Sequence, residues 1–318
     1  MVNSPAGLIP LPLSRSVLER HRMRSRRMIR PGMLGGHLMR RKGQSMEFRD
    51  YEYYQRGDDI RHVDWRASAR CGQPEDLLIK NFGAEEQLKI FVSLDNRASM
   101  RLPERVPKLQ HALWIAEALG VMTAPFGDHA TLHRLFGKYD SGLVQLGRGA
   151  SCLPGGYQAF FSEENNNGEE VNLRPLKKHL PPTAIWIIIS DFYFEDDENS
   201  KMLVDAINRA QDGMRWIILI DIDSWPHEKA MLGEGSRKID GPEIGDIKAE
   251  YDLDDYVYEE LNKAITSHKD RFFDRINNGT FDRTIWTWPK EPEFNHEDYF
   301  RGRFLGENLI EKIFMRDS

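Results

Sequence analysis

Residues 88–100 read LKIFVSLDNRASM, an apolar run of strand length that ends at Asp95 and continues into a polar turn. Two further runs, TAIWIIIS at 183–190 and MRWIILI at 214–220, are also followed directly by an aspartate. Strands that are apolar at nearly every position are typical of parallel sheets covered on both faces. We therefore expect a parallel α/β domain to begin at residue 88.

Helical patterns alternate with these strands. Residues 106–122, 201–213 and 254–279 place apolar side chains at helical spacing. Further short strand candidates are 129–136, 142–146 and 281–288. The alternation predicts an α/β fold with a doubly wound, mostly parallel sheet. Such sheets bind ligands beyond the carboxyl ends of their strands, where Asp95, Asp191 and Asp221 are expected.

The chain divides by composition into three parts: a basic N-terminal arm at 1–42, a region of short strands and loops at 43–87, and the α/β domain at 88–318. Residues 14–30 predict a short basic helix that stops before Pro31. The net charge is −6, yet residues 14–42 carry ten Lys or Arg and one acid. This arm could lie on the acidic body of the protein, or bind an acidic partner, nucleic acid or an anionic membrane surface.

The composition bounds the setting of the protein. Its only two cysteines, Cys71 and Cys152, lie far apart, which excludes a disulfide framework and favours a reducing, cytoplasmic compartment. No apolar run approaches the roughly 20 residues of a membrane-spanning helix, and the first residues do not have the pattern of a signal peptide. The arginines of the arm have no interleaved aromatic residues that could stack on bases, so nucleic acid is the less favoured partner.

The turn after the first strand has the residues of a magnesium site. Asp95, the hydroxyl of Ser99 and a second strand-end aspartate, Asp191, could supply the oxygen ligands that Mg²⁺ prefers. The same aspartates could equally cap helices or loop amides. Arg97 weakens the metal interpretation, because a guanidinium stays protonated and repels a divalent ion nearby. Arg97 could pair with Asp95 or Asp191 in place of the metal, point outward toward a partner carboxylate, or lie in solvent.

Two other stretches concentrate charge. GDDIRHVDWRASAR at 57–70 alternates aspartates and arginines around a tryptophan, which suits a network of buried or half-buried Arg–carboxylate pairs and, less well, direct contact with a partner. LIDIDSW at 219–225 places Asp221 and Asp223 after a strand, as in phosphatases that use an aspartate nucleophile. A metal-dependent phosphatase or hydrolase using Asp95, Asp191, Asp221 and Asp223 is therefore the alternative function, although ordinary loop aspartates explain the pattern as well.

The stretch GQSMEFRDYEYYQRGDDIRHVDWRASAR at 43–70 resembles the signature of the domain of unknown function 58 family, DUF58. The pattern is a glycine, Glu-Phe, a tyrosine, then Gly-Asp-Asp-x-Arg-x-[Ile/Val]-Asp-Trp and [Ser/Thr]-Ala-Arg. The positions that meet it are Gly43, Glu47, Phe48, Tyr54, Gly57, Asp58, Asp59, Arg61, Val63, Asp64, Trp65, Ser68, Ala69 and Arg70. Among them, Glu47, Asp58, Asp59, Arg61, Asp64, Trp65 and Arg70 are expected to be structural.

The resemblance implies a von Willebrand factor A-like domain with a metal-ion-dependent adhesion site. The first loop of that site is Asp-x-Ser-x-Ser, and here Arg97 replaces the middle serine. Asp191 matches the aspartate of the third loop, and Ser151 is the candidate for the threonine of the second. The resemblance thus implies a degenerate site, with Mg²⁺ as the ion that the intact pattern would hold.

The resemblance also implies a non-enzymatic bacterial adaptor that works with a MoxR-type AAA+ ATPase on a client protein, in the cytoplasm, with a peripheral membrane contact through the basic arm as a further option. Arg97, with Asn96 beside it, is then expected to contact a partner carboxylate.

Overall fold

The computed structural model describes residues 10–18, 48–54, 60–70, 77–82, 89–103, 106–123, 129–137, 143–146, 170–180, 184–194, 198–212, 215–239, 249–276, 281–291 and 293–306. The chain forms two compact units. The larger unit combines residues 1–33 with 88–318, and the smaller unit is 34–87. Each unit is described by itself.

The large unit is built on a sheet of six strands: β3 Lys89–Leu94, β4 His129–Arg134, β5 Leu143–Leu146, β6 Ile185–Ser190, β7 Trp216–Asp223 and β10 Phe281–Thr287. Their order across the sheet is β10-β7-β6-β3-β4-β5. Every pair is parallel except β4 with the edge strand β5, which is antiparallel. The predicted doubly wound, mostly parallel α/β fold is confirmed, and it is compatible with a von Willebrand factor A-like domain.

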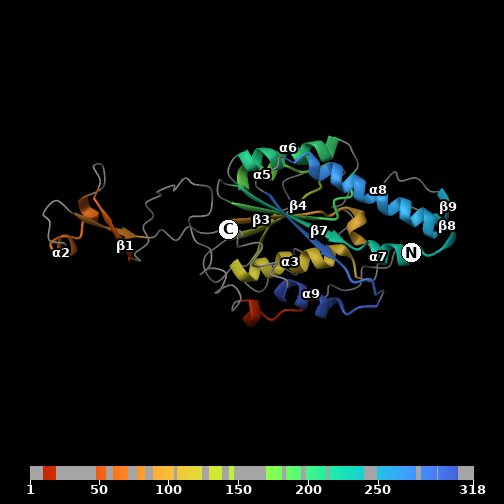
Figure 1. The fold of residues 1–318 in the computed structure, drawn as a ribbon, viewed down its shortest axis with the longest axis horizontal. Coiled ribbons are helices and arrows are strands. Elements are labelled where there is room, and N and C mark those ends of the chain that lie inside the picture. Colours follow the sequence, from red (N-terminus) through yellow and green to blue (C-terminus); the bar gives the residue numbers. More distant parts are fainter. Residues whose placement is uncertain are drawn as a thin grey trace. The chain divides into compact units, whose positions relative to one another are not determined.

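Helices cover both faces of this sheet (Figure 1). One face carries α3 Lys108–Thr123 and α9 His296–Gly306, and the other carries α5 Arg174–His179, α6 Glu198–Asp212 and α8 Asp255–Asp274. Alternate residues of each strand therefore enter two separate cores. In β6, Ile187 packs in the core with α3 and α9, whereas Trp186 packs in the core with α6 and α8. Burial on both faces explains why these strands are apolar throughout.

Several elements of the large unit were not predicted from the sequence, among them the short helices α5 and α7 Trp225–Leu232. The hairpin of β8 Gly235–Ile239 and β9 Ala249–Leu253 is mostly exposed, so its residues show no apolar alternation. Helix α9 has an aromatic buried face but only two fully buried residues, Phe300 and Phe304. Among the described helices, none has both the length and the apolar character needed to cross a membrane.

Residues 10–18 belong to the core of the large unit. Leu13 and Leu18 are buried there, and the Nε–H of Arg301 in α9 donates to the carbonyl of Pro12 over 3.1 Å. The backbone is helical at residues 15–18, where the predicted basic helix begins. The remainder of that predicted helix, from residue 19 on, lies outside the described residues.

The small unit pairs β1 Phe48–Tyr53 with β2 Leu78–Phe82 in an antiparallel ladder. Between them lie two short helices, η1 Ile60–His62 and α2 Trp65–Ser68. Asp64 caps α2, because its carboxylate accepts from the backbone N–H groups of Arg66 and Ala67. These strands and short helices lie within the unit 34–87, and the predicted division at residues 42 and 87 stays a prediction.

Candidate functional site

The candidate site lies where the strand order of the sheet reverses. From β3 the chain moves to β4 on one side and then returns to β6 on the other, so β3 and β6 are neighbours at the topological switch point. Asp95 and Asp191 directly follow these two strands. The backbone N–H of Asp95 donates to the carbonyl of Ile189 over 2.9 Å, which holds the two strand ends side by side. Ligands of doubly wound sheets bind at this position.

Asp95 is fully buried and accepts several hydrogen bonds. Its Oδ2 accepts from the hydroxyl of Ser190 over 2.7 Å and from the Nη2 of Arg97 over 2.7 Å. Its Oδ1 accepts from the backbone N–H of Arg97 over 3.0 Å and from the Nε of Arg97 over 3.1 Å. Both oxygens of the carboxylate are therefore occupied by groups of the chain itself.

Arg97 points inward and fills the space between the two aspartates. Besides its contacts with Asp95, its Nη2 lies 3.3 Å from Asp191 Oδ1, and its Nη1 donates to the carbonyl of Tyr193 over 3.0 Å. The guanidinium carbon lies 5.0 Å from the ring centre of Phe136 and 4.5 Å from that of Phe194. Only 16% of the side chain is exposed. Of the orientations open from the sequence, ion pairing with the aspartates is the one found.

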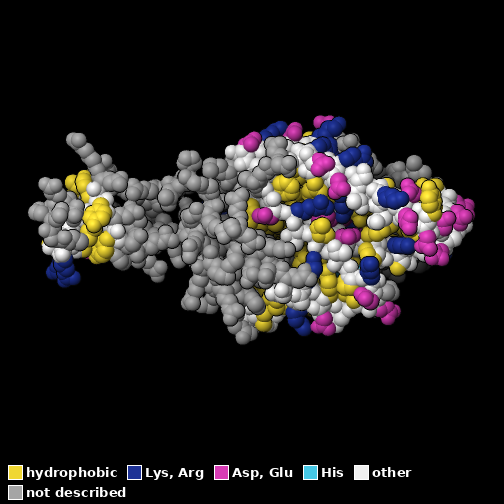
Figure 2. Space-filling view, in the orientation of Figure 1, with side chains coloured by type: hydrophobic (Ala, Val, Ile, Leu, Met, Phe, Trp, Pro, Cys, Tyr) yellow, Lys and Arg dark blue, Asp and Glu magenta, His cyan; other side chains and the backbone are white. Residues whose placement is uncertain are grey.

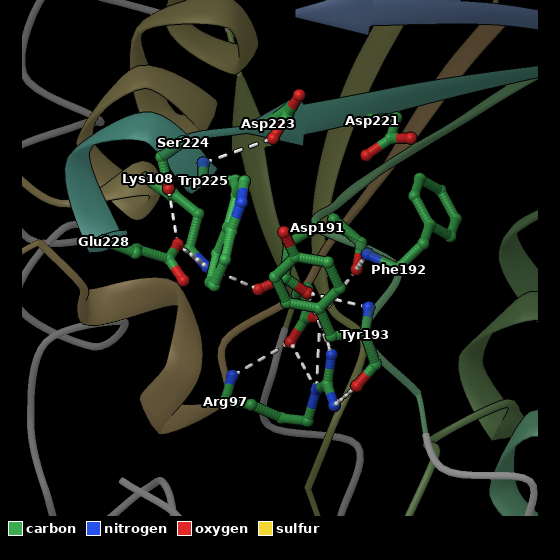
Figure 3. A network of polar contacts seen from close by, with 12 residues as sticks. Arg97, Lys108, Asp191, Phe192, Tyr193, Asp221, Asp223, Ser224, Trp225 and Glu228 are labelled. Carbon is green, nitrogen blue, oxygen red and sulfur yellow. Dashed lines mark hydrogen bonds and ion pairs between the residues drawn. The ribbon is translucent and has the colours of Figure 1, made fainter. Parts of the chain in front are cut away.

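A second cation, Lys108, approaches from the first turn of α3. Its ammonium lies 2.6 Å from Asp191 Oδ2 and 2.8 Å from Glu228 Oε1, and its side chain is only 1% exposed. Glu228 belongs to the short helix α7, Trp225–Leu232, and also accepts from the Ser224 hydroxyl over 2.5 Å. Figure 3 shows Arg97, Lys108 and Tyr193 grouped around Asp191. The network thus joins the switch point to α3 and α7.

Burial and the two cations act in opposite directions on Asp191. Burial raises the pKa of the carboxyl, but the charges of Lys108 and Arg97 outweigh it and lower that pKa from 3.8 to about 2. For Lys108, burial lowers the pKa of the ammonium. The negative charges of Asp191 and Glu228 outweigh this effect, so that the pKa is raised. Both groups are therefore charged at neutral pH.

The next strand repeats the arrangement. Asp221 is buried, its Oδ1 accepts from Lys269 of α8 over 2.7 Å, and its Oδ2 accepts from Arg283 of β10 over 2.8 Å. The sequence predicted Asp221 at the end of a strand. The strand β7 continues to Asp223, so Asp221 instead lies inside the strand. Asp223 lies at the strand end and accepts from the backbone N–H of Trp225 over 3.2 Å.

Tyr193 lies over these charges. The ammonium of Lys108 is 5.1 Å and that of Lys269 is 4.6 Å from its ring centre. Burial and the carboxylates of Glu228, Asp191, Asp223 and Asp221 all raise the pKa of its hydroxyl, which stays protonated. The preceding residue, Phe192, has a φ of 54°, which is uncommon for a residue other than glycine. This turn directs the N–H of Tyr193 to Asp191 and its carbonyl to Arg97.

A comparison with known protein families identifies the family of the chain. Residues 50–270 match the family described as "Protein of unknown function DUF58". The chain belongs to the DUF58 family. No curated protein matches it. The resemblance read from residues 43–70 is thus confirmed at the level of the family.

Part of the DUF58 signature is exposed, whereas Val63 and Ser68 are buried. Arg61, Arg66 and Arg70 are exposed, so the expectation of buried or half-buried pairs is wrong for these arginines. Trp65 is 61% exposed. Asp64 caps α2 and accepts from the hydroxyl of Tyr51 over 3.0 Å, a structural role as expected. Glu47, Asp58 and Asp59 lie outside the described residues.

The residues predicted for the adhesion site of this DUF58 chain lie in different places in the structure. Ser99 lies in the short helix η2, Ala98–Arg101, and Ser151 lies outside the described residues. Asn96 is buried, and its side-chain oxygen accepts from the backbone N–H of Phe136 over 2.9 Å. Direct contact with a partner would require Arg97 and Asn96 to point outward. That expectation is wrong, because both side chains bind groups inside the protein.

A divalent metal does not fit the site. The oxygens of Asp95 and Asp191 that would bind Mg²⁺ already accept from Arg97, Lys108, Ser190 and Tyr193. Two cations within 3.3 Å of these oxygens would repel a further positive ion. Across the described ranges, no three His, Cys, Asp or Glu side chains are arranged to hold a metal ion.

Sequence reasoning found Asp95, Arg97 and Asp191 but missed Lys108, Glu228, Lys269 and Arg283. Lys108 carried one usable signal. A cation in the first turn of a helix opposes the helix dipole, so it is unfavourable there unless a carboxylate lies near it. The other three residues lie on amphipathic or exposed elements, where charged side chains are ordinary.

Proposed function

We propose that this DUF58 protein is a non-enzymatic interaction subunit, an adaptor that works with a MoxR-type AAA+ ATPase in remodelling or assembling a protein complex in the cytoplasm. The observation that carries the proposal is an exposed aromatic and basic face on the small unit. Tyr53, Ile60 and Trp65 are 63%, 59% and 61% exposed, and Tyr51 is exposed as well. Isolated proteins rarely leave clustered large apolar side chains in water unless they bind a partner.

This face has the composition of a protein-binding surface. Tyr51 and Tyr53 lie two residues apart on β1 and so on one side of that strand. Arg61, Arg66 and Arg70 are exposed on η1, on α2 and just after α2. Figure 2, in the orientation of Figure 1, shows hydrophobic side chains over the elements of this unit with basic side chains beside them. Tyrosine, tryptophan and arginine are the residues most often found at the energetic centre of interfaces.

The aspartates at the sheet edge support binding rather than hydrolysis. The alternative function, a metal-dependent phosphatase, requires carboxylates that reach a substrate. Asp95, Asp191 and Asp221 are buried, and each is bound to cations of the chain. A nucleophile or metal ligand in that state would first have to break its ion pairs.

The test is affinity capture of the tagged full chain from lysate of its own host, with and without a non-hydrolysable ATP analogue, after nuclease treatment. The expected result is recovery of a AAA+ ATPase, identified by mass spectrometry. The double variant Tyr53→Ala/Trp65→Ala should lose this recovery. Tyr256→Ala, at a side chain of the large unit that is 70% exposed, is the matched control and should retain it.

EDTA separates the proposal from a metal-dependent one. Since no metal fits the site, EDTA is expected to leave recovery of the ATPase unchanged in the condition without nucleotide. Absence of a AAA+ ATPase in both nucleotide conditions would contradict the proposed function. Mg²⁺-dependent turnover of a generic phosphoester by the purified chain would instead support the phosphatase.

A further inference from the structure

The ionic charges at the switch point sum to −1, which is also the sum that one divalent ion in place of the two cations would give. Asp95, Asp191 and Glu228 contribute three negative charges, and Arg97 and Lys108 contribute two positive ones. We propose that Arg97 and Lys108 are built-in counter-ions that together replace one divalent cation, and that removing both converts the site into a Mg²⁺ site. This inference does not depend on the proposed adaptor function.

Each of the two cations bridges a pair of carboxylates that a single metal ion could otherwise bridge. The guanidinium bridges Asp95 and Asp191, at 2.7 and 3.3 Å, as a metal shared by two strand ends would. The ammonium takes the other oxygen of Asp191 and bridges it to Glu228, at 2.6 and 2.8 Å. Each of the three carboxylates is thus paired with a cation of the chain, without an ion from solution, so formation of the site does not depend on the metal concentration.

Both cations are fixed in place, which makes displacement by a metal unfavourable. Arg97 lies against the rings of Phe136 and Phe194 and donates to the Tyr193 carbonyl. Lys108 is fully buried. A Mg²⁺ ion entering the wild type would have to displace a buried or half-buried cation from its ion pair with Asp95 or Asp191. The wild type is therefore expected not to bind Mg²⁺ at this site.

Each cation alone is enough to exclude the metal. In Arg97→Ser the ammonium of Lys108 still lies on Asp191, and in Lys108→Met the guanidinium still bridges the two aspartates. The double variant Arg97→Ser/Lys108→Met leaves Asp95, Asp191 and Glu228 with no cation from residues 97 and 108. The new serine hydroxyl adds a further oxygen, and methionine keeps much of the volume of the lysine stem. Oxygen ligands with excess negative charge are what Mg²⁺ requires.

The experiment measures melting temperature and calorimetric binding as Mg²⁺ or Mn²⁺ is added to the full chain. The double variant should show a saturable rise in melting temperature and one binding event. The wild type and both single variants should show neither. Arg97→Ser/Lys229→Met is the matched control, because Lys229 is 42% exposed and pairs with Asp255 instead, and it should also show neither.

The experiment also tests the proposal if the double variant fails to fold without metal. If the double variant is unfolded without metal, Mg²⁺ should restore its circular dichroism and EDTA should remove it again, while EDTA leaves the wild type unchanged. Saturable Mg²⁺ stabilisation of the wild type would overturn the proposal. A double variant that folds but binds no metal would also overturn the proposal. The same holds if both Arg97→Ser/Lys108→Met and a second double variant, Arg97→Ser/Lys108→Gln, fail to fold in excess Mg²⁺.

Discussion

Lys108 is the residue on which the buried carboxylates depend most directly. Among the described residues, its replacement by methionine leaves Glu228 with the Ser224 hydroxyl as its side-chain partner and Asp191 with Arg97 as its cation. Removing one member of a buried ion pair typically costs about 3–5 kcal/mol. We expect Lys108→Met to lower the free energy of unfolding by an amount in this range, measured by urea denaturation.

The control for this loss is Lys229→Met. That lysine is also paired with a carboxylate, Asp255, but both side chains are largely exposed. Exposed pairs contribute roughly 0–1 kcal/mol. If Lys108→Met cost no more than Lys229→Met, the buried network would not stabilise the native state in the way its geometry indicates.

At the scale of single elements, α7 is too short to be stable alone. It has eight residues, and isolated helices below about 12 residues are marginal in water. Its Glu228 connects it to Lys108. We expect Glu228→Gln to increase the hydrogen exchange of the α7 amides by roughly ten- to a hundredfold, since about 1.4–2.8 kcal/mol of local stability is lost. Glu259→Gln, at an exposed position of α8, should leave α7 unchanged; equal exchange in both variants would argue against the tie.

The N-terminal segment is a second element whose role depends on packing. Leu18 is fully buried in the core with α3 and α9, although it lies at the start of a strongly basic stretch. Truncation of a buried leucine typically costs about 2–5 kcal/mol. We expect Leu18→Ala to destabilise the large unit by this amount in urea denaturation, while Ser16→Ala, at an exposed residue, stays within about 0.5 kcal/mol of the wild type. A neutral Leu18→Ala would show that the segment is detached from the core in solution.

For the whole molecule, buried histidines set the response to acid. Burial lowers the pKa of His133 from 6.5 to about 3, and burial with the neighbouring His296 lowers that of His111 well below 6.5. Between pH 6 and 4 the unfolded chain protonates His133 while the native state does not. Stability therefore falls as the pH falls, by about 1.4 kcal/mol per pH unit for His133, and the lowered pKa of His111 acts in the same direction.

We expect the free energy of unfolding to fall by at least about 1.4 kcal/mol per pH unit over this range, from urea denaturation at successive pH values. His133→Gln should reduce the slope by about 1.4 kcal/mol per pH unit. The low pKa of Asp191, about 2 against 3.8, adds a further loss only below pH 3.8. A flat profile between pH 6 and 4 would mean that the two histidines are accessible to protons in the native state.

The sequence by itself determined the architecture of the large unit. Its strands are buried on both faces, so the apolar runs around Val92, Ile187 and Leu219 could be recognised without knowledge of their partners. The family also followed from local residues, since its signature is contiguous. Because parallel strands end at one edge of a sheet, Asp95 and Asp191 could be placed together, and Arg97 two residues after Asp95 already argued against a metal.

Only the tertiary structure decided what occupies the site. Lys108 is 83 residues from Asp191 and 120 from Glu228 along the chain. No local pattern links a lysine in the first turn of one helix to a glutamate in another. These charges meet because the strand order reverses between β3 and β6, which brings α3 and α7 to the same edge of the sheet. Burial then requires that each carboxylate find a cation there, and the chain supplies its own.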